Sequence, residues 1–159
     1  DWIGVNYYYR EIVAFSPNTV GFVKRSVAKG SSLTEMGWEI YPLGIHDLCR
    51  ELVASYPGVP LVITENGLAD ATDTHRPRFI MDHVAWLKKS VDEGLPVLGY
   101  MHWSMSDNLE WLDGYVPKFG LYRVDRSTME RTRTRSAAVF SWIARNNRLP
   151  SEQEFAAIV

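Results

Sequence analysis

The chain has 159 residues and a net charge of −2, with 46% hydrophobic and 23% charged residues. This size and composition are typical of one globular domain with a sizeable core. Acidic and basic residues are mixed along the chain, and the apolar stretches are too short to span a bilayer. We therefore expect neither nucleic acid nor a membrane as a partner.

Apolar runs and amphipathic segments alternate along the chain, and proline or glycine stands at several of their boundaries. The predicted elements in chain order are a strand over 2–7, a long surface excursion over 10–41, a helix over 42–56, a strand over 61–64, a loop over 66–77, a helix over 78–93, a strand over 97–102, a strand or strand-like return over 119–124 and a helix over 134–145. The tail from 151 to 159 is weakly specified. This order predicts a parallel sheet with right-handed crossovers.

Cys49 is the only cysteine, so an internal disulfide is impossible. It falls in the helical pattern of the first predicted helix, where we expect a small buried hydrophobic residue. A lone cysteine fits a reducing compartment, and we expect a cytoplasmic location. The chain opens directly on a strand-like segment, which is typical of the middle of a protein.

Polar and aromatic side chains follow each predicted strand at its carboxyl end. They are Asn6, Tyr7 and Tyr8 after the first strand, Glu65 and Asn66 after the second, and His102, Trp103, Asp107, Asn108, Glu110 and Trp111 after the third. In parallel α/β folds, functional groups gather at this edge of the sheet. A carboxylate facing tryptophans and a second acid suits a site that holds a sugar and cleaves its glycosidic bond.

Each of these residues also has a structural interpretation. A carboxylate such as Glu65 can cap a helix or lie at the surface, and the tyrosines and tryptophans can belong to the core. Asp107 can brace its own loop through backbone contacts, and His102 can pack or make one hydrogen bond. We interpret Asp70 and Asp73, which lie among threonines, as part of a solvated loop.

No signal for a metal or a cofactor is present. The histidines at 46, 75 and 83 have no metal-like spacing, and neither a phosphate-binding loop nor a nucleophile elbow occurs. We therefore predict a site without metal or cofactor.

The chain resembles the C-terminal part of the family 1 glycoside hydrolases, the β-glucosidase and β-galactosidase family. The matching segments are Asp1–Tyr8, Ile63–Gly67, Gly99–Ser104, Asp107–Trp111, and Lys118–Leu121 with Val124 and Asp125. Their order and approximate spacing match the family over nearly the whole chain. The pair Arg76 and Pro77 is most similar to the archaeal-type branch.

The resemblance implies a (β/α)8 TIM barrel, of which this chain supplies roughly strands 6–8 and their helices. Residues 1–159 would be the C-terminal portion of one glycosidase domain, with strands 1–5 absent from this chain. A complete barrel needs about 250 residues. In the family, an Asn-Glu-Pro motif on the fourth strand carries the acid/base glutamate, and no such motif occurs here.

The resemblance also implies a retaining mechanism in which Glu65 is the nucleophile and forms a covalent glycosyl-enzyme. Tyr8 matches the tyrosine that hydrogen-bonds this carboxylate, and Asn6 lies beside it. The implied sugar contacts are Trp103 as a platform, Glu110 as acceptor from two hydroxyls, Trp111 as an indole donor and Phe119 at the far end of the pocket. A carboxylate at Glu110 would repel a phosphate, so the implied substrate is a neutral β-glucoside or β-galactoside.

Three hypotheses remain open at this point. The chain can be one piece of a β-glycosidase completed by the N-terminal segment of the same barrel, which we prefer. It can be a half-barrel without hydrolase activity that binds glycans weakly, or a folding fragment without function. The missing acid/base separates the first from the others, since general acid catalysis contributes a factor of roughly 10²–10⁴.

The open strand edges of such a fragment bear on its behaviour in solution. Unpaired edges and an uncovered apolar face favour association. We predict that the chain alone is sticky, oligomeric or poorly folded. A homo-oligomer is also among the states that the archaeal-type resemblance implies.

Overall fold

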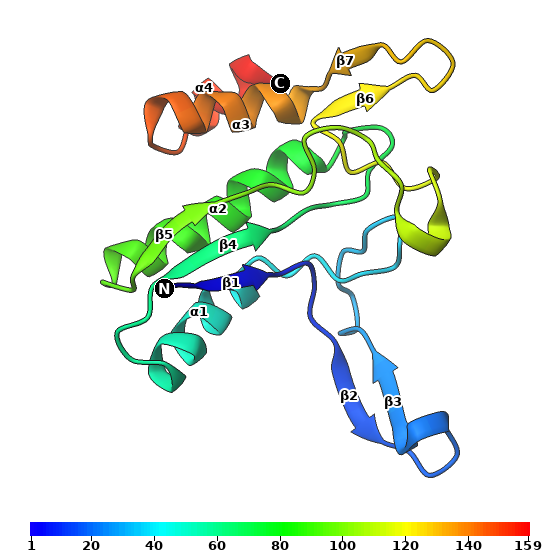
Figure 1. Cartoon of the computed structure of the whole chain (residues 1–159), viewed down its shortest axis with the longest axis vertical. Coiled ribbons are helices and arrows are strands. Elements are labelled where there is room, and N and C mark those ends of the chain that lie inside the picture. The colour runs from blue at the N-terminus through cyan, green and yellow to red at the C-terminus, as the bar shows by residue number, and fades with distance from the viewer.

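The computed structural model describes all 159 residues and has a three-stranded parallel sheet at its centre (Figure 1). The strands are β1 (Ile3–Asn6), β4 (Leu61–Glu65) and β5 (Val97–Tyr100), in the order β1–β4–β5. The predicted parallel sheet is therefore confirmed. β5 ends two residues earlier than predicted, because regular pairing with β4 stops at Ile63 and Tyr100.

Three helices lie beside this sheet: α1 (Leu43–Ser55), α2 (Arg76–Asp92) and α3 (Arg135–Asn146). α1 packs against α2, and α2 packs against α3. α2 begins two residues before its predicted start, because a carboxylate in the preceding loop, Asp70, accepts hydrogen bonds from its first N–H groups. None of the helices combines the length and apolar character needed to cross a bilayer.

Two clusters of buried side chains form the core. The first joins the sheet to α1 and α2 and contains Val5, Tyr7, Ile45, Cys49, Leu61, Ile63 and Leu87. The second joins α2 to α3 and contains Leu68, Phe79, Ile80, Met81, Leu121, Ala137 and Val139. The prediction that Cys49 is buried is confirmed.

The opposite face of the sheet has no covering layer in this chain. Gly4 and Asn6 of β1 are exposed there, and so is Leu98 of β5. Because successive residues of a strand point to opposite faces, the apolar partners of these positions face the helices. The sheet is therefore covered on the helix side only.

The surface excursion over 10–41 is more regular than predicted. It contains an antiparallel hairpin of β2 (Ile12–Phe15) and β3 (Val23–Ser26), which extends away from the body of the molecule (Figure 1). The aliphatic and aromatic residues of β2 favour an extended strand. All residues of both strands are exposed, which explains why no buried periodicity marked them.

The C-terminal region also holds two elements that were not predicted. β6 (Tyr122–Val124) pairs with β7 (Arg131–Arg133), so only the end of the predicted strand over 119–124 is a strand. Asp125 folds the connecting turn by accepting from the backbone N–H and hydroxyl of Ser127. The tail forms α4 (Glu152–Ile158), which begins with a capping box.

Candidate active site

Tyr8 and Glu65 lie together at the carboxyl ends of β1 and β4. Tyr8 Oη donates a hydrogen bond of 2.6 Å to Glu65 Oε2. The strands are parallel and Asn6 is opposite Glu65, so the chain beyond β1 passes directly beside this carboxylate. Burial and the bond to Glu65 raise the pKa of Tyr8, so the phenol remains a protonated donor.

Two asparagines stabilise this edge of the sheet. Asn6 is exposed, and its Oδ1 accepts from Thr64 Oγ1 over 2.7 Å. Asn66 is fully buried; its Nδ2 donates to the Tyr7 carbonyl over 2.7 Å, and its Oδ1 accepts from Tyr100 Oη over 2.9 Å. Asn66 therefore links the ends of all three strands directly behind Glu65.

Trp103 and Glu110 form a second pair at the same edge. Trp103 Nε1 donates to Glu110 Oε1 over 3.0 Å, and the peptide bond between Trp103 and Ser104 is cis. Burial raises the pKa of Glu110, the bond from Trp103 opposes this rise, and the negative charge of Glu65 adds to it. Glu65 is thus close enough to act electrostatically on Glu110.

Gly67 allows the Trp103 segment to approach β4. Any side chain at this position would clash with the backbone carbonyl of Trp103. The carbonyl of Asn66, the residue before Gly67, accepts a hydrogen bond from the Trp103 N–H over 2.9 Å. The close passage of these two segments places the tryptophan beside the end of β4.

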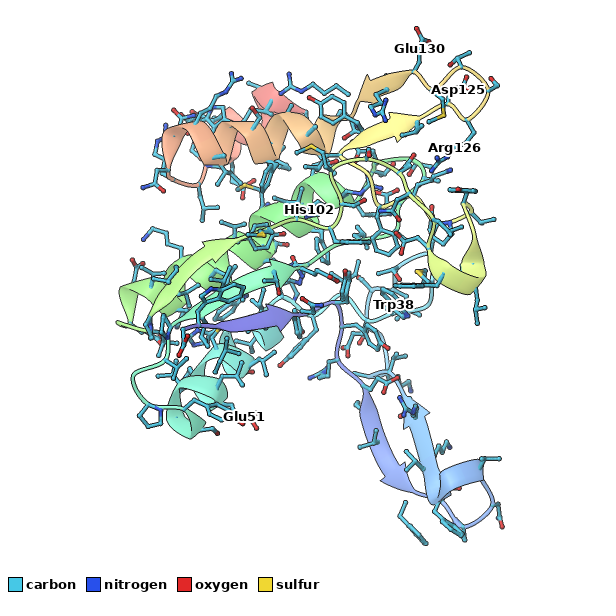
Figure 2. All side chains as sticks on the ribbon, in the orientation of Figure 1. Trp38, Glu51, His102, Asp125, Arg126 and Glu130 are labelled. Atoms are coloured by element: carbon cyan, nitrogen blue, oxygen red, sulfur yellow. The ribbon has the colours of Figure 1, made fainter.

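Phe119 and Trp38 complete an aromatic cluster around Tyr8. Phe119 is buried and meets the Tyr8 ring edge-on, with centroids 6.3 Å apart and an angle of 88°. Trp38 lies 5.7 Å from Tyr8, 6.1 Å from Phe119 and 4.8 Å from Tyr9, on which it stacks (Figure 2). Trp38 was not predicted as a site residue, although it is the only tryptophan in the excursion over 10–41, and this is a signal that could have found it.

Trp111 is not brought into this cluster. It begins the short helix η2 (Trp111–Asp113), and its side chain is 88% exposed. The turn that carries it is held by local bonds, such as Glu110 N–H to the Gly114 carbonyl over 2.7 Å. None of the three residues of η2 is buried, so the turn makes no core contact that would fix the position of the indole.

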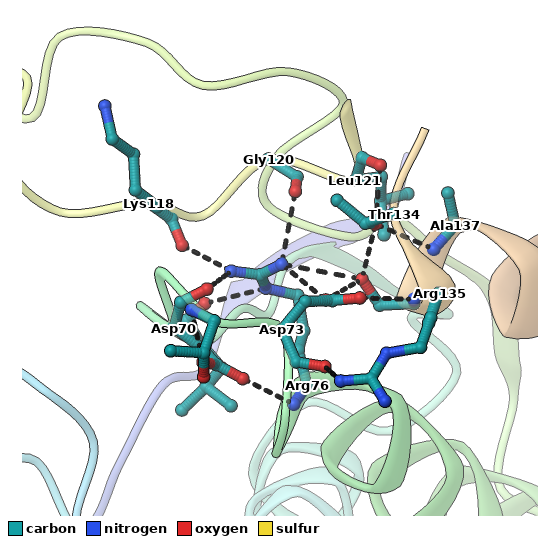
Figure 3. A network of polar contacts seen from close by, with 12 residues as sticks. Asp70, Asp73, Arg76, Lys118, Gly120, Leu121, Thr134, Arg135 and Ala137 are labelled. Carbon is teal, nitrogen blue, oxygen red and sulfur yellow. Dashed lines mark hydrogen bonds and ion pairs between the residues drawn. The ribbon is translucent and has the colours of Figure 1, made fainter. Parts of the chain in front are cut away.

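Asp70 and Asp73 are buried, so the prediction of a solvated loop was wrong for these two residues, whereas the neighbouring Thr72 and Thr74 are exposed as expected. Both residues are 3% exposed, because they serve the N-termini of two helices and a buried arginine (Figure 3). Asp70 Oδ2 accepts from the N–H groups of His75 and Arg76. Asp73 Oδ1 accepts from Arg76 Nη1 over 2.7 Å, and its Oδ2 accepts from the Ser136 N–H over 3.0 Å.

Asp107 and His102 have the structural roles that their types suggest. Asp107 braces its loop by accepting from the N–H groups of Gly120 over 3.0 Å and Val124 over 3.3 Å. His102 Nδ1 lies 3.1 Å from Tyr100 Oη. No group of three or more histidine, cysteine or acidic side chains is arranged to hold a metal ion.

Known proteins that resemble this chain agree with one another. A family model described as glycosyl hydrolase family 1 matches residues 1–149. A beta-galactosidase from Pyrococcus woesei is 38% identical over 165 residues, which cover 92% of this chain and 32% of the relative. Beta-glucosidase A from Thermotoga maritima is 36% identical over 161 residues, covering 94% of this chain and 35% of the relative.

Solved structures give the same result. A beta-glycosidase from Pyrococcus horikoshii matches with a TM-score of 0.87 and 42% identity, over 96% of this chain and 36% of that one. This chain therefore spans about a third of the length of the relatives that it matches.

Proposed function

The chain belongs to glycosyl hydrolase family 1, and on that premise we propose that it forms the C-terminal part of a retaining β-glycosidase. Its three parallel strands would be strands 6–8 of a (β/α)8 barrel. The open face of the sheet and the outer strands β1 and β5, which have one partner each, support this proposal. The partner of this chain would then be the N-terminal segment of the same barrel, which would contain strands 1–5.

The observation that carries the proposal is the pair of Tyr8 and Glu65, with Trp103 and Glu110 at the same edge. Glu65 would attack the anomeric carbon, and the bond to the leaving oxygen would break as the glycosyl-enzyme ester forms. Water would then attack the same carbon and release Glu65 as a carboxylate. Tyr8 can donate to the charged form of Glu65 before and after this cycle.

The proton for the leaving group must come from an acid/base residue outside this chain. The other carboxylates that follow the strands of this chain, Glu110 and Asp107, do not suit that role. Glu110 is held by Trp103, and Asp107 is committed to backbone N–H groups. We assign the acid/base to the N-terminal segment, as the family resemblance implies.

The proposed substrate is a neutral β-glycoside with a terminal glucosyl or galactosyl residue. Glu110 supports this, because an ionised carboxylate accepts hydrogen bonds from sugar hydroxyls and repels a phosphate. Trp103 would supply an apolar platform beneath the sugar. Trp111 and Phe119 remain proposed sugar contacts. The exposed Trp111 would reach the sugar by a movement of its turn, or when the N-terminal segment packs over that turn.

Intact mass and covalent labelling test the proposal. The purified, undissociated protein is treated with an activated aryl β-glucoside, and separately with a fluoro-glycoside that traps the glycosyl-enzyme. We expect turnover and a single label on Glu65, and no label in E65Q, with a loss of activity on the order of 10⁴-fold or more. Turnover with Glu65 unlabelled would contradict the assignment of the nucleophile.

The alternative is a half-barrel that only binds glycans, or an inactive fragment. If no N-terminal segment accompanies the chain, the absence of an Asn-Glu-Pro motif favours this alternative. In that case the 159-residue chain would be present alone, and the label would not react. A homo-oligomer and a cytoplasmic location stay predictions of the sequence.

A further inference from the structure

Arg76 is the largest fully buried side chain in the molecule, and it lies at the start of α2. Its guanidinium donates mainly to backbone carbonyls of distant segments (Figure 3). Nε donates to Leu68 over 3.1 Å, Nη1 to Gly120 over 3.2 Å, and Nη2 to the carbonyls of Asp70 and Lys118. One side chain thus joins the segment after β4 to the segment before β6.

The charge of Arg76 is compensated inside the protein. Asp73 Oδ1 lies 2.7 Å from Nη1, and Asp73 itself holds Ser136 at the start of α3. Burial lowers the pKa of Arg76, and Asp73 and Asp70 oppose that change. An arginine remains charged under these conditions, so all of its N–H donors make charge-assisted hydrogen bonds.

The two carbonyls held by Arg76 in the second segment, those of Lys118 and Gly120, flank Phe119. The same short segment is fixed from its other side, since Gly120 N–H donates to Asp107 Oδ1 over 3.0 Å. The Phe119 carbonyl accepts from the Ser104 N–H over 3.2 Å. Arg76 and Asp107 therefore clamp the backbone on which the Phe119 ring is mounted.

Phe119 connects this clamp to the proposed nucleophile. Its ring supports Tyr8 edge-on, and Tyr8 holds Glu65 through the 2.6 Å bond. A displacement of the clamped segment would move the ring away from Tyr8. The bond between Tyr8 and Glu65 would then lose the support on that side.

We propose that Arg76 is a positioning residue for the proposed glycosidase: it fixes Phe119, and through it the orientation of Tyr8 toward Glu65. This inference rests on the proposed function. Lysine cannot replace arginine in this role, because its single ammonium group cannot reach carbonyls in both segments with the planar fork of a guanidinium. R76K therefore keeps the positive charge beside Asp73 and removes the clamp.

The test separates the rate of the chemical step from the amount of folded protein. The complete protein is labelled on Glu65 with a saturating fluoro-glycoside, and both the final stoichiometry and the rate constant are measured by intact mass. A merely structural role lowers the stoichiometry or the thermal midpoint but leaves the rate constant of the folded molecules unchanged. A positioning role slows the labelling of molecules that still react fully.

We expect R76K to reach the wild-type stoichiometry with a rate constant about ten- to a hundredfold lower, the range for slightly misplaced catalytic groups. R78M is the matched control, since Arg78 lies on the same helix but is exposed and pairs with Asp82 and Glu152. It should label at the wild-type rate. R76K labelled at the wild-type rate would overturn the inference.

F119L tests the connection independently of Arg76. We expect slower labelling, and in the double variant R76K/F119L less slowing than the product of the two single effects, because both act on one pathway. Multiplicative effects, or F119L at the wild-type rate, would overturn the inference; the second result decides even if Arg76 variants do not fold. Failure of the wild-type protein to label would instead reject the proposed function.

Discussion

The hydroxyl of Tyr8 lies 2.6 Å from Glu65 Oε2, so that a neutral donor touches the carboxylate proposed to attack the sugar. Y8F removes only this hydroxyl and keeps the ring against Trp38 and Phe119. A hydrogen bond to a charged group contributes about 1.5–3 kcal/mol. We expect glycosyl-enzyme formation to slow about ten- to a hundredfold in pre-steady-state labelling.

Y9F is the matched control for this experiment, because the Tyr9 ring stacks on Trp38 and would keep that contact. It should label at the wild-type rate. Equal rates for Y8F and the wild type would remove Tyr8 from the mechanism.

We predict that the ionised Glu110 lowers the stability of the fold at neutral pH and strengthens sugar binding. Its pKa is raised in the folded protein by burial, so its contribution to stability is present at low pH and lost as the pH rises through that pKa. E110Q should therefore melt at a higher temperature than the wild type at neutral pH, while binding a neutral β-glycoside about tenfold or more weakly. Calorimetry measures both quantities.

E130Q is a suitable comparison for E110Q, since Glu130 lies far from the site on the β6–β7 hairpin (Figure 2). It should alter neither quantity. Unchanged affinity in E110Q would argue against a contact between Glu110 and the sugar.

The burial of His83 predicts that the free energy of unfolding decreases as the pH falls below neutral. Burial lowers its pKa from 6.5 to about 4, so the unfolded chain binds a proton that the folded protein excludes. The stability it contributes is present above about pH 6.5 and falls as the pH drops toward 4, by about 1.4 kcal/mol for each unit of pKa difference. Chemical unfolding at several pH values should show a shallower pH dependence in H83F.

The exposed His75 provides the comparison, as H75N should follow the wild-type curve. If H83F and the wild type lose stability in parallel, then His83 is not excluded from protonation as its burial implies.

Asp73 and Asp82 offer a comparison between a buried and a half-buried partner of arginine. D73N removes the carboxylate that pairs with Arg76 in the interior, which costs about 3–5 kcal/mol. D82N removes a half-buried carboxylate from a pair with the exposed Arg78 and should cost less than about 1 kcal/mol. Urea unfolding, extrapolated to zero urea with the measured dependence of the free energy of unfolding on urea concentration, gives both values. Similar costs for D73N and D82N would show that the network around Asp73 is dispensable.

The sheet and the meeting of its polar ends could be predicted from sequence. The run Leu61–Thr64 is continuous and apolar, so it has few options besides a buried strand, and Glu65 must then lie at its end. Parallel pairing follows from the alternating helices. Tyr8 could be assigned to Glu65 only through the resemblance, since residues 57 positions apart carry no local signal of their contact.

The buried network could not be predicted in this way. Asp70 and Asp73, with the neighbouring Thr72 and Thr74, have the composition of a surface loop, and the burial of the two aspartates depends on Arg76. That side chain is satisfied by backbone carbonyls at Lys118 and Gly120, 42 and 44 positions away, whose side chains reveal nothing about the contact. The position of Trp111 depends on a turn whose residues are all outside the core, so the motif alone could not define it.

The outer strands β1 and β5 have a practical consequence, since each presents one edge without a strand partner. If the proposed N-terminal segment supplies those partners, the two parts of the barrel could be produced as separate polypeptides, one with the proposed acid/base and the other with the proposed nucleophile. Fused to two proteins that meet in a cell, such halves would report the encounter by releasing a coloured or fluorescent aglycone. The break would fall between the acid/base and the nucleophile, so neither half would give a background signal.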